Sequence, residues 1–385
     1  MIPQEGTMER CIVAFSARSE RIGETYSFDD VYERLSGNGV PKLVIFSSDF
    51  DNFSLYSGLF HEKFPESHVI GMSSDCIYSS EGCSDTGLSA LAIYSGIECA
   101  CGVLHEAGRC PIKYTKNALK AIDELGITAR DSGRVCCLEF TASYEYNEEL
   151  VLDTFREARG NSRKITLFGS SAAQRRGTER SYVSLDGEVY EDESVFVYIR
   201  NLNGSITVIS ENTYRPTGKY FTATDVDCDS KTVYEFNERP AAAYLASLIG
   251  VEVPVVARDI ARYPVGRIYD NKIYIATGRS VGKNASITFG STVYNYSDTV
   301  LLEPDDPHKV SDRLIADIDD LGFKPSFSLA VNCAFNYDIF ADTGITGTFA
   351  KRLAEKAGVY AGVSGRSEQL GCANITKTML LAAFE

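Results

Sequence analysis

The sequence predicts a mixed α/β fold made of repeated helix–strand–helix–strand units with added β-hairpins, in which helices cover mixed sheets. Two observations support this prediction. Three apolar runs end in the same Gly-x-Ser pattern, at Gly71, Gly169 and Gly362, and the same order of elements precedes each one. The chain also has 385 residues, more than one hydrophobic core usually serves, so we expect two tandem related domains.

The first unit shows the pattern most clearly. Residues 27–37 begin with a serine, carry apolar side chains at helical spacing and end in glycine, which is typical of a short helix. The apolar run 41–48 then predicts a buried strand, residues 54–64 a second helix and residues 68–71 a second strand.

Two later stretches repeat this order. The expected helix, strand, helix and strand of the second unit are 115–126, 134–141, 147–160 and 164–169. Those of the third unit are 306–322, 327–335, 345–358 and 359–362. Alternating runs with hairpin signals follow each unit, so we expect added antiparallel strands there.

Residues 217–303 fit the repeat least well, because they contain one helical piece, 240–250, among strands and turns. We interpret this region as the divergent first half of a C-terminal domain. Pro216 and Gly218 interrupt the chain just before it. The predicted domains are therefore 1–215, with two α/β units, and 216–385.

The Gly-x-Ser pattern has a simple physical interpretation. A glycine at the end of a strand allows a sharp turn, and a serine hydroxyl behind it can bind loop amides or a ligand. Ligands tend to bind at strand ends in sheets with helical crossovers. We therefore expect the three glycines at strand ends, and the serines of these turns at the rim of a ligand pocket: Ser73, Ser74, Ser171 and Ser364.

Charge and composition exclude several classes of function. The net charge of −15 opposes binding to nucleic acids and anionic lipids, and no cluster of basic residues offsets it. The sequence begins without a secretory signal pattern, and no apolar run is long enough to insert into a membrane. We expect a cytoplasmic protein whose eleven cysteines are reduced and mostly buried.

Catalytic and metal motifs are missing from the sequence. No Gly-x-Ser is followed by the second glycine of a nucleophile elbow, since Ala173 and Arg366 stand there in two of the copies. There is no phosphate-binding loop, no C-x-x-C pair and no His/Cys spacing typical of a metal site. We predict a protein that is not an enzyme and needs no cofactor, with a serine- or cysteine-dependent enzyme using Cys333 or Cys372 as an alternative.

The last Gly-x-Ser is followed by two charges, Arg366 and Glu368. Together they could bind the carboxylate and the amine of a small polar ligand. If the strands of the third unit are joined by one right-handed helical crossover, their ends lie at the same sheet edge. We therefore expect Arg366 and Glu368 to face one pocket with Cys333.

Several segments resemble the FIST sensory domains, in which an N-terminal FIST domain precedes a C-terminal one. The N-terminal similarity lies in KLVIFSS, VIGMSSDCIYSSEG and LFGSSAAQ, and in YVSLDGEVYEDESVFVYI. The C-terminal similarity lies in KTVYEFNERPAAAYLASLIG, SLAVNCAF and AGVSGRSEQLGCANITKTMLLAAF. The resemblance implies a FIST N-type domain over 1–215 and a FIST C-type domain over 216–385.

The resemblance implies a protein of signal transduction that senses a small ligand such as an amino acid without turning it over. Cys333 and Glu368 match residues common in the family, whereas Ser367 replaces a glycine and Thr376 an asparagine. An arginine usual after the cysteine is absent, with Asn336 near its place. Some similar proteins bind haem and sense nitric oxide, which gives a further alternative. No output domain is left over, so we expect a stand-alone receptor with a signalling partner in trans.

Overall fold

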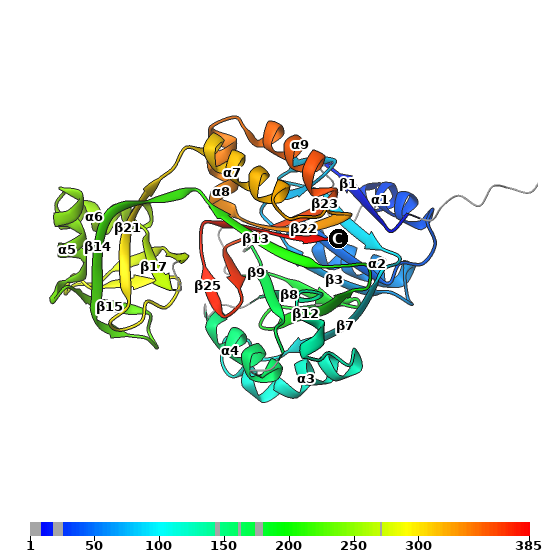
Figure 1. Ribbon diagram of the computed structural model, residues 1–385, viewed down its shortest axis with the longest axis horizontal. Helices are drawn as coiled ribbons and strands as arrows, with labels where there is room; N and C mark the ends of the chain where they lie inside the picture. Colours follow the sequence, from blue (N-terminus) through cyan, green and yellow to red (C-terminus); the bar gives the residue numbers. More distant parts are fainter. Residues whose placement is uncertain (1–8, 18–25, 143–146, 161–162, 174–179, 270–271) are drawn as a thin grey trace, which may run out of the picture.

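The protein has the mixed α/β architecture that the sequence predicts (Figure 1). The computed structural model describes residues 9–17, 26–142, 147–160, 163–173, 180–269 and 272–385. Figure 1 shows a larger body of helix-covered sheets and a smaller β-rich lobe at one side.

Each of the three predicted units begins with a helix, which is followed by two parallel strands. A second helix connects these two strands. In the first unit these elements are α1 (Tyr26–Ser36), β2 (Leu43–Ser48), α2 (Phe53–Lys63) and β3 (His68–Ser73). In the second they are α3 (Thr115–Glu124), β8 (Val135–Thr141), α4 (Glu148–Arg159) and β9 (Thr166–Ser171). In the third they are α7 (Pro307–Asp319), β22 (Phe327–Cys333), α9 (Thr346–Ala357) and β23 (Val359–Gly365).

The third unit differs from the prediction at one point. The expected strand 327–335 ends at Cys333, and α8 (Ala334–Asp342) begins there, so two helices rather than one join β22 to β23. Cys333 is the N-cap residue of α8. The strand end and the helix start therefore meet at this cysteine.

Two antiparallel strands complete the sheet of each unit. The strands that pair with β2, β8 and β22 are β6 (Leu88–Ile93), β12 (Ser194–Asn201) and β26 (Thr378–Phe384). The edge strands next to them are β1 (Cys11–Ser16), β7 (Ile97–Leu104) and β13 (Ile206–Asn212). The repeat predicted from Gly-x-Ser is thus a repeat of whole sheets.

The hairpins that follow the Gly-x-Ser strands are exchanged between units in a closed cycle. They are β4–β5 (Ile77–Ser79, Gly82–Ser84), β10–β11 (Val183–Leu185, Glu188–Tyr190) and β24–β25 (Ser367–Leu370, Ala373–Ile375). The first unit's hairpin pairs with β23 of the third, the second unit's with β3 of the first, and the third unit's with β9 of the second. Separating any unit from the other two therefore breaks two backbone ladders.

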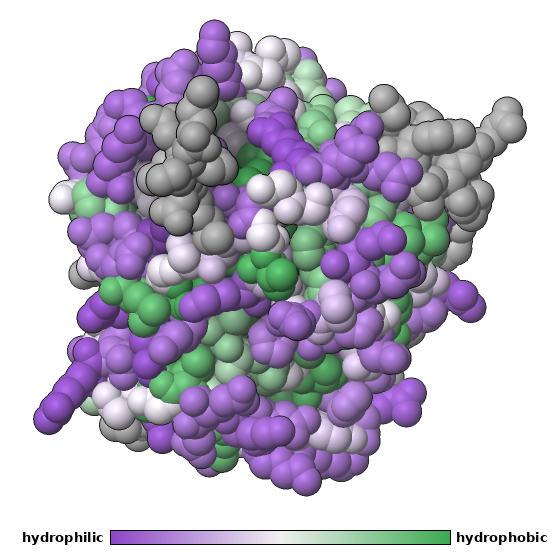
Figure 2. All heavy atoms as spheres, turned by 90° about the vertical axis from the view of Figure 1, so that its right-hand side faces the viewer, coloured by the Kyte–Doolittle hydropathy of each residue, from purple (hydrophilic) through white to green (hydrophobic). Residues whose placement is uncertain are grey.

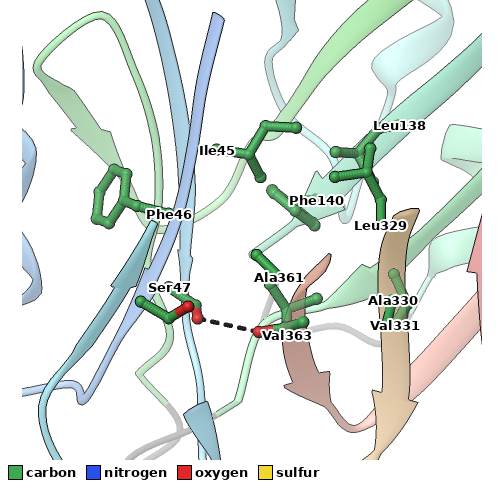
Figure 3. Close-up of a pocket in the computed structure, with 12 residues that line it drawn as sticks. Ile45, Phe46, Ser47, Leu138, Phe140, Leu329, Ala330, Val331, Ala361 and Val363 are labelled. Carbon is green, nitrogen blue, oxygen red and sulfur yellow. Dashed lines mark hydrogen bonds between the residues drawn. The ribbon is translucent and has the colours of Figure 1, made fainter. Parts of the chain in front are cut away.

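The three sheets share one apolar core. Equivalent residues of β2, β8 and β22, namely Ile45, Leu138 and Leu329, are all part of it. Figure 3 shows these side chains approaching each other around a small cavity, with the Ser47 hydroxyl donating to the carbonyl of Gly362 at 3.2 Å. The helices of each unit cover the outer face of its own sheet. Burial of both faces explains why the parallel strands are continuous apolar runs in the sequence.

The β-rich lobe lies between β13 and α7, inside the third unit (Figure 1). Its strands are β14 (Tyr214–Asp227), β15 (Thr232–Phe236), β16 (Arg239–Pro240), β17 (Val265–Tyr269), β18 (Lys272–Ala276), β19 (Gly278–Val281), β20 (Ile287–Phe289) and β21 (Asp298–Pro304). Its helices α5 (Ala241–Ile249) and α6 (Val253–Asp259) pack on a separate apolar core. A division of the chain at 215/216 stays a prediction. That position falls within β14, while the third unit shares its sheets and core with the first two.

The prediction that the three glycines end their strands is wrong. Gly71, Gly169 and Gly362 each lie in the middle of β3, β9 and β23, at equivalent positions. A Cβ added to Gly71 would lie 2.3 Å from the Phe46 ring, and one added to Gly362 would lie 2.2 Å from the Tyr78 ring. Glycine is needed there because a neighbouring group crosses the strand closely, not because the backbone turns.

Two further observations concern the surface. Figure 2 shows the face on the α1 side, where hydrophilic residues predominate and separate the apolar ones into small groups. Within the described ranges, no single helix is long and apolar enough to cross a bilayer. One pair of helices, Ala241–Ile249 with Val253–Arg262, meets these criteria only together and with a 99° bend.

Candidate functional site

Ser73, Ser171 and Ser364 lie in three different sheets and Ser74 lies just after β3, so the predicted serines do not form one pocket rim. Ser73 accepts the N–H of Tyr182 and donates to the carbonyl of Ala173, both at 3.0 Å. Ser74 accepts the N–H of Ser364 at 2.8 Å and so links the first unit to the third. Both hydroxyls therefore stabilise the joints between units.

The two remaining serines occupy equivalent positions with different surroundings. Ser171 donates to Glu148 at 3.1 Å and accepts from Gln369 at 3.2 Å. The hydroxyl of Ser364 has no hydrogen-bonding partner among the described residues and lines a small cavity. Only Ser364 has a hydroxyl left over for another molecule.

Cys333 and Glu368 lie together, as the sequence predicts. Cys333 ends β22, and Glu368 lies in β24, opposite Ser170 of β9. Both side chains are fully buried, and the thiol lies within hydrogen-bonding reach of the carboxyl group. The backbone N–H groups of Phe335 and Lys377 also point at the sulfur. Cys333 and Glu368 are therefore neighbours, although two helices join β22 to β23 and Glu368 lies on a strand paired with β9 of the second unit.

Arg366 is not part of this group. Its side chain is exposed, and its backbone N–H donates to the carbonyl of Ser171 at 3.1 Å. The expectation that Arg366 faces the same pocket as Cys333 is therefore wrong. The cation near Glu368 is Lys377, only 4% exposed, in the turn between β25 and β26.

Lys377 is held by aromatic rings. Its ammonium group lies 4.2 Å from the ring centre of Phe335 and 5.0 Å from that of Tyr214. Its backbone has φ = 55°, a left-handed conformation that is uncommon for a side chain of this size. Such conformations tend to persist at functional sites. Sequence reasoning missed this lysine, although it lies within the NITKTMLL segment used for the resemblance.

Burial dominates the electrostatics of this cluster of Cys333, Glu368 and Lys377, here called the thiol–carboxyl cluster. Burial raises the pKa of Glu368 well above its usual range, although the Thr378 N–H donates to its Oε2 at 3.2 Å. Burial also raises the pKa of the Cys333 thiol and lowers the pKa of Lys377. The Oε1 atom of Glu368 has no partner among the described residues. The cluster therefore has an acceptor that another donor could use.

A second polar cluster joins the second unit to the lobe. Lys231 lies 2.5 Å from Glu149 and 3.6 Å from Glu148, and all three side chains are largely buried. Burial raises the pKa of Glu148, whereas Lys231 and the Thr292 N–H outweigh burial and lower the pKa of Glu149. The ammonium group of Lys231 thus offsets negative charge on these glutamates. We interpret this cluster as the attachment of the lobe.

The residues present do not fit a haem group. His61 and His308 are exposed, His68 lies 3.2 Å from Asp186, and His105 lies 3.5 Å from Glu193. None of the four lines any of the three best-formed cavities of the described residues, which measure about 10 to 20 Å³.

Comparison with known families adds to these observations. The model of the FIST N domain matches residues 42–239, half of the chain. The chain belongs to the FIST N domain family. This match covers most of the first unit, the second unit and the lobe as far as β16. FIST domains are sensory domains of signal transduction. No curated protein matches the chain.

Proposed function

We propose that this FIST protein is a cytoplasmic sensor that binds a small polar ligand, such as an amino acid, at the thiol–carboxyl cluster without turning it over. The observation that carries the proposal is the partnerless Oε1 of Glu368. A fully buried carboxyl group without its full set of hydrogen bonds is costly, so a ligand that donates to it gains affinity.

The chemistry of the cluster favours a ligand with an ammonium group. A carboxyl group and two aromatic rings are typical partners of an organic cation, and here the rings of Phe335 and Tyr214 already hold the ammonium of Lys377. Phe335 is 47% exposed and lies at the surface side of the cluster. A ligand ammonium would therefore enter beside Phe335 and compete with Lys377 for the rings.

The location suits signal output. Tyr214 is the first residue of β14, the strand that leads into the lobe. A ligand that displaces Lys377 from Tyr214 would alter the contact at the base of the lobe. A signalling protein that binds in trans could detect this change. The serines listed above and Arg366 are not needed for the proposal.

The test begins with mass spectrometry of the native protein to identify a co-purified small molecule. Calorimetry then compares its affinity for the wild type and for Glu368→Gln. We expect binding to weaken roughly 10-fold to 100-fold, the loss typical of a charge-assisted hydrogen bond. Glu139→Gln is the matched control, because Glu139 is an equally buried carboxyl group in the second unit. Equal affinity of wild type and Glu368→Gln would refute the proposal.

One observation favours a second candidate, a cysteine-dependent enzyme. Cys333 lies at the N-terminus of α8, two backbone N–H groups point at its sulfur, and Glu368 is placed to accept its proton. A helix N-terminus and a neighbouring base can activate a thiol, but burial opposes this here because it raises the pKa of Cys333. The two candidates differ in the behaviour of Cys333→Ser. This variant loses turnover if the protein is an enzyme and keeps ligand affinity if it is a sensor.

A further inference from the structure

A cavity lies on the other face of the third sheet. Residues of β22 and β23 that point away from the central core, Asn332 and Ser364, line a cavity together with side chains of α9, including Thr346. Its volume is about 20 Å³. One water molecule needs roughly 10 to 15 Å³, so the cavity has room for a molecule of about two heavy atoms.

Three hydroxyl groups line this cavity without a partner among the described residues. They belong to Tyr78, Thr346 and Ser364, and the side chains of Tyr78 and Ser364 are buried. Burial raises the pKa of Tyr78, so its phenol stays protonated and can donate. The absence of a side chain at Gly362 lets the Tyr78 ring lie across β23. The cavity is therefore built to hydrogen-bond a very small polar molecule.

Two thiols border the same cavity. Cys76 directly precedes β4, and Cys83 lies in β5, where it is paired with Tyr78 of β4. Their sulfur atoms lie 3.3 Å apart and form no disulfide. A disulfide bond is about 2.05 Å long, so a shift of little more than 1 Å would join them. Cys83 is partly exposed, which gives the cavity a side towards solvent.

We propose that this cavity binds hydrogen peroxide and that Cys76 and Cys83 reduce it to water while forming a disulfide. The sulfur of one thiol attacks a peroxide oxygen, the O–O bond breaks, and the thiol proton joins the departing oxygen as water. The second sulfur then attacks the resulting sulfenic acid, the S–O bond breaks, and the second thiol proton leaves with that oxygen as water. One peroxide thus consumes two thiols and yields two water molecules.

The three hydroxyls have a defined part in this reaction. They hold the peroxide beside the sulfur atoms and can donate to the departing oxygen, on which negative charge develops. The small volume selects for peroxide over bulkier oxidants. None of these residues belongs to the thiol–carboxyl cluster, so this redox function goes beyond the ligand sensing proposed above and can fail or succeed without it.

The test uses the full-length reduced protein and measures disulfide formation by peptide mapping under non-reducing conditions. With hydrogen peroxide we expect a Cys76–Cys83 disulfide before the exposed Cys228 is oxidised. With tert-butyl hydroperoxide, which is too large for the cavity, we expect the order to reverse. Oxidation of Cys228 first by both reagents would refute the proposal, and so would equal preference for the two reagents.

Two variants test the hydroxyls. Tyr78→Phe should slow disulfide formation about tenfold, because one hydrogen bond to the peroxide is lost. Tyr360→Phe is the matched control, since the Tyr360 hydroxyl lines the same cavity but already donates to the carbonyl of Ala350 at 3.3 Å. An unchanged rate in Tyr78→Phe would overturn the proposal. If this variant does not fold, Ser364→Ala replaces it with the same expected result.

Discussion

The second and third units of this protein arrange their sheet strands in the same way but have different side chains beside the central glycine. In the second unit, Gly169 is flanked by Glu139 on β8 and Gln369 on β24. In the third unit, Gly362 is flanked by Ala330 on β22 and Tyr78 on β4. One position therefore holds a buried carboxyl group and an amide, and the other holds a phenol beside a cavity.

The difference shows what the exchanged hairpins contribute. The residue opposite each glycine comes from another unit, so the chemistry of every sheet depends on two units at once. In the first unit, Phe46 covers Gly71 and the buried Ser184 lies opposite it, so an aromatic ring and a hydroxyl group occupy this place. At each glycine, one neighbouring residue comes from the unit's own strand and the other from the exchanged hairpin, and both residues differ between the units.

The largest expected effect comes from filling the space at the glycines. A Cβ at residue 169 would lie 2.0 Å from the carbonyl oxygen of Glu139, which is backbone and cannot move aside. We expect Gly169→Ala to lower the free energy of unfolding by about 3 kcal/mol or more. Gly362→Ala meets the Tyr78 ring, which can shift towards the cavity, so its cost should be about 1 to 2 kcal/mol.

Urea denaturation of both variants measures this comparison. Gly58→Ala serves as the control, because a Cβ there would meet nothing within 4 Å and the residue lies in a helix. Equal destabilisation by Gly169→Ala and Gly362→Ala would mean that the Tyr78 ring is held as rigidly as the backbone. The ring would then not shift into the cavity beside it.

The second prediction concerns the pH dependence that Glu139 adds to the second unit. Burial raises its pKa to about 7, and its Oε2 accepts from the hydroxyls of Thr141 and Ser194. The folded state therefore holds a proton that the unfolded chain loses near its ordinary pKa of 4.5. The neutral carboxyl group favours folding most at low pH, and this contribution falls as pH rises to about 7.

Glu139→Gln removes this titration, so the variant should gain stability relative to the wild type between pH 5 and pH 8. A shift from 4.5 to about 7 corresponds to roughly 3 kcal/mol at most. This gain is measured as the difference in the free energy of unfolding between wild type and variant, at pH 5 and again at pH 8. A difference that does not change with pH would show that Glu139 is ionised in the folded protein. The third unit has Ala330 at this position and makes no such contribution.

The three units could be predicted from sequence because each is a local pattern. Buried parallel strands and amphipathic helices are continuous segments, so apolar runs and helical spacing identify them. The hairpin exchange could not be predicted, since strands of three residues such as Ile77–Ser79 carry almost no information about their partner. The three sheets and their shared core depend on this exchange.

The site was predicted in part for the same reason. Cys333 and Glu368 meet because the parallel pair β22 and β23 leads to one sheet edge, which topology alone implies. Lys377 enters from the next turn, and its position depends on a left-handed backbone that the sequence does not announce. The glycines were misplaced because a strand end and a close crossing of a strand give the same Gly-x-Ser pattern.

The smallest expected effect compares the two equivalent serines. Ser171 has two side-chain partners, Glu148 and Gln369, whereas the hydroxyl of Ser364 has none among the described residues. Ser171→Ala removes the hydroxyl that donates to Oε1 of the buried Glu148, while the Gln369 amide keeps two other acceptors, so we expect a cost of about 1 to 2 kcal/mol. Ser364→Ala removes a buried hydroxyl that has no partner among the described residues. We therefore expect its free energy of unfolding to equal that of the wild type or to be slightly higher. Thermal unfolding of the wild type and both variants at one pH measures the two losses of stability.

A clear loss of stability in Ser364→Ala would mean that the Ser364 hydroxyl is hydrogen-bonded in the folded protein. The cavity would then have one donor fewer to offer a bound molecule.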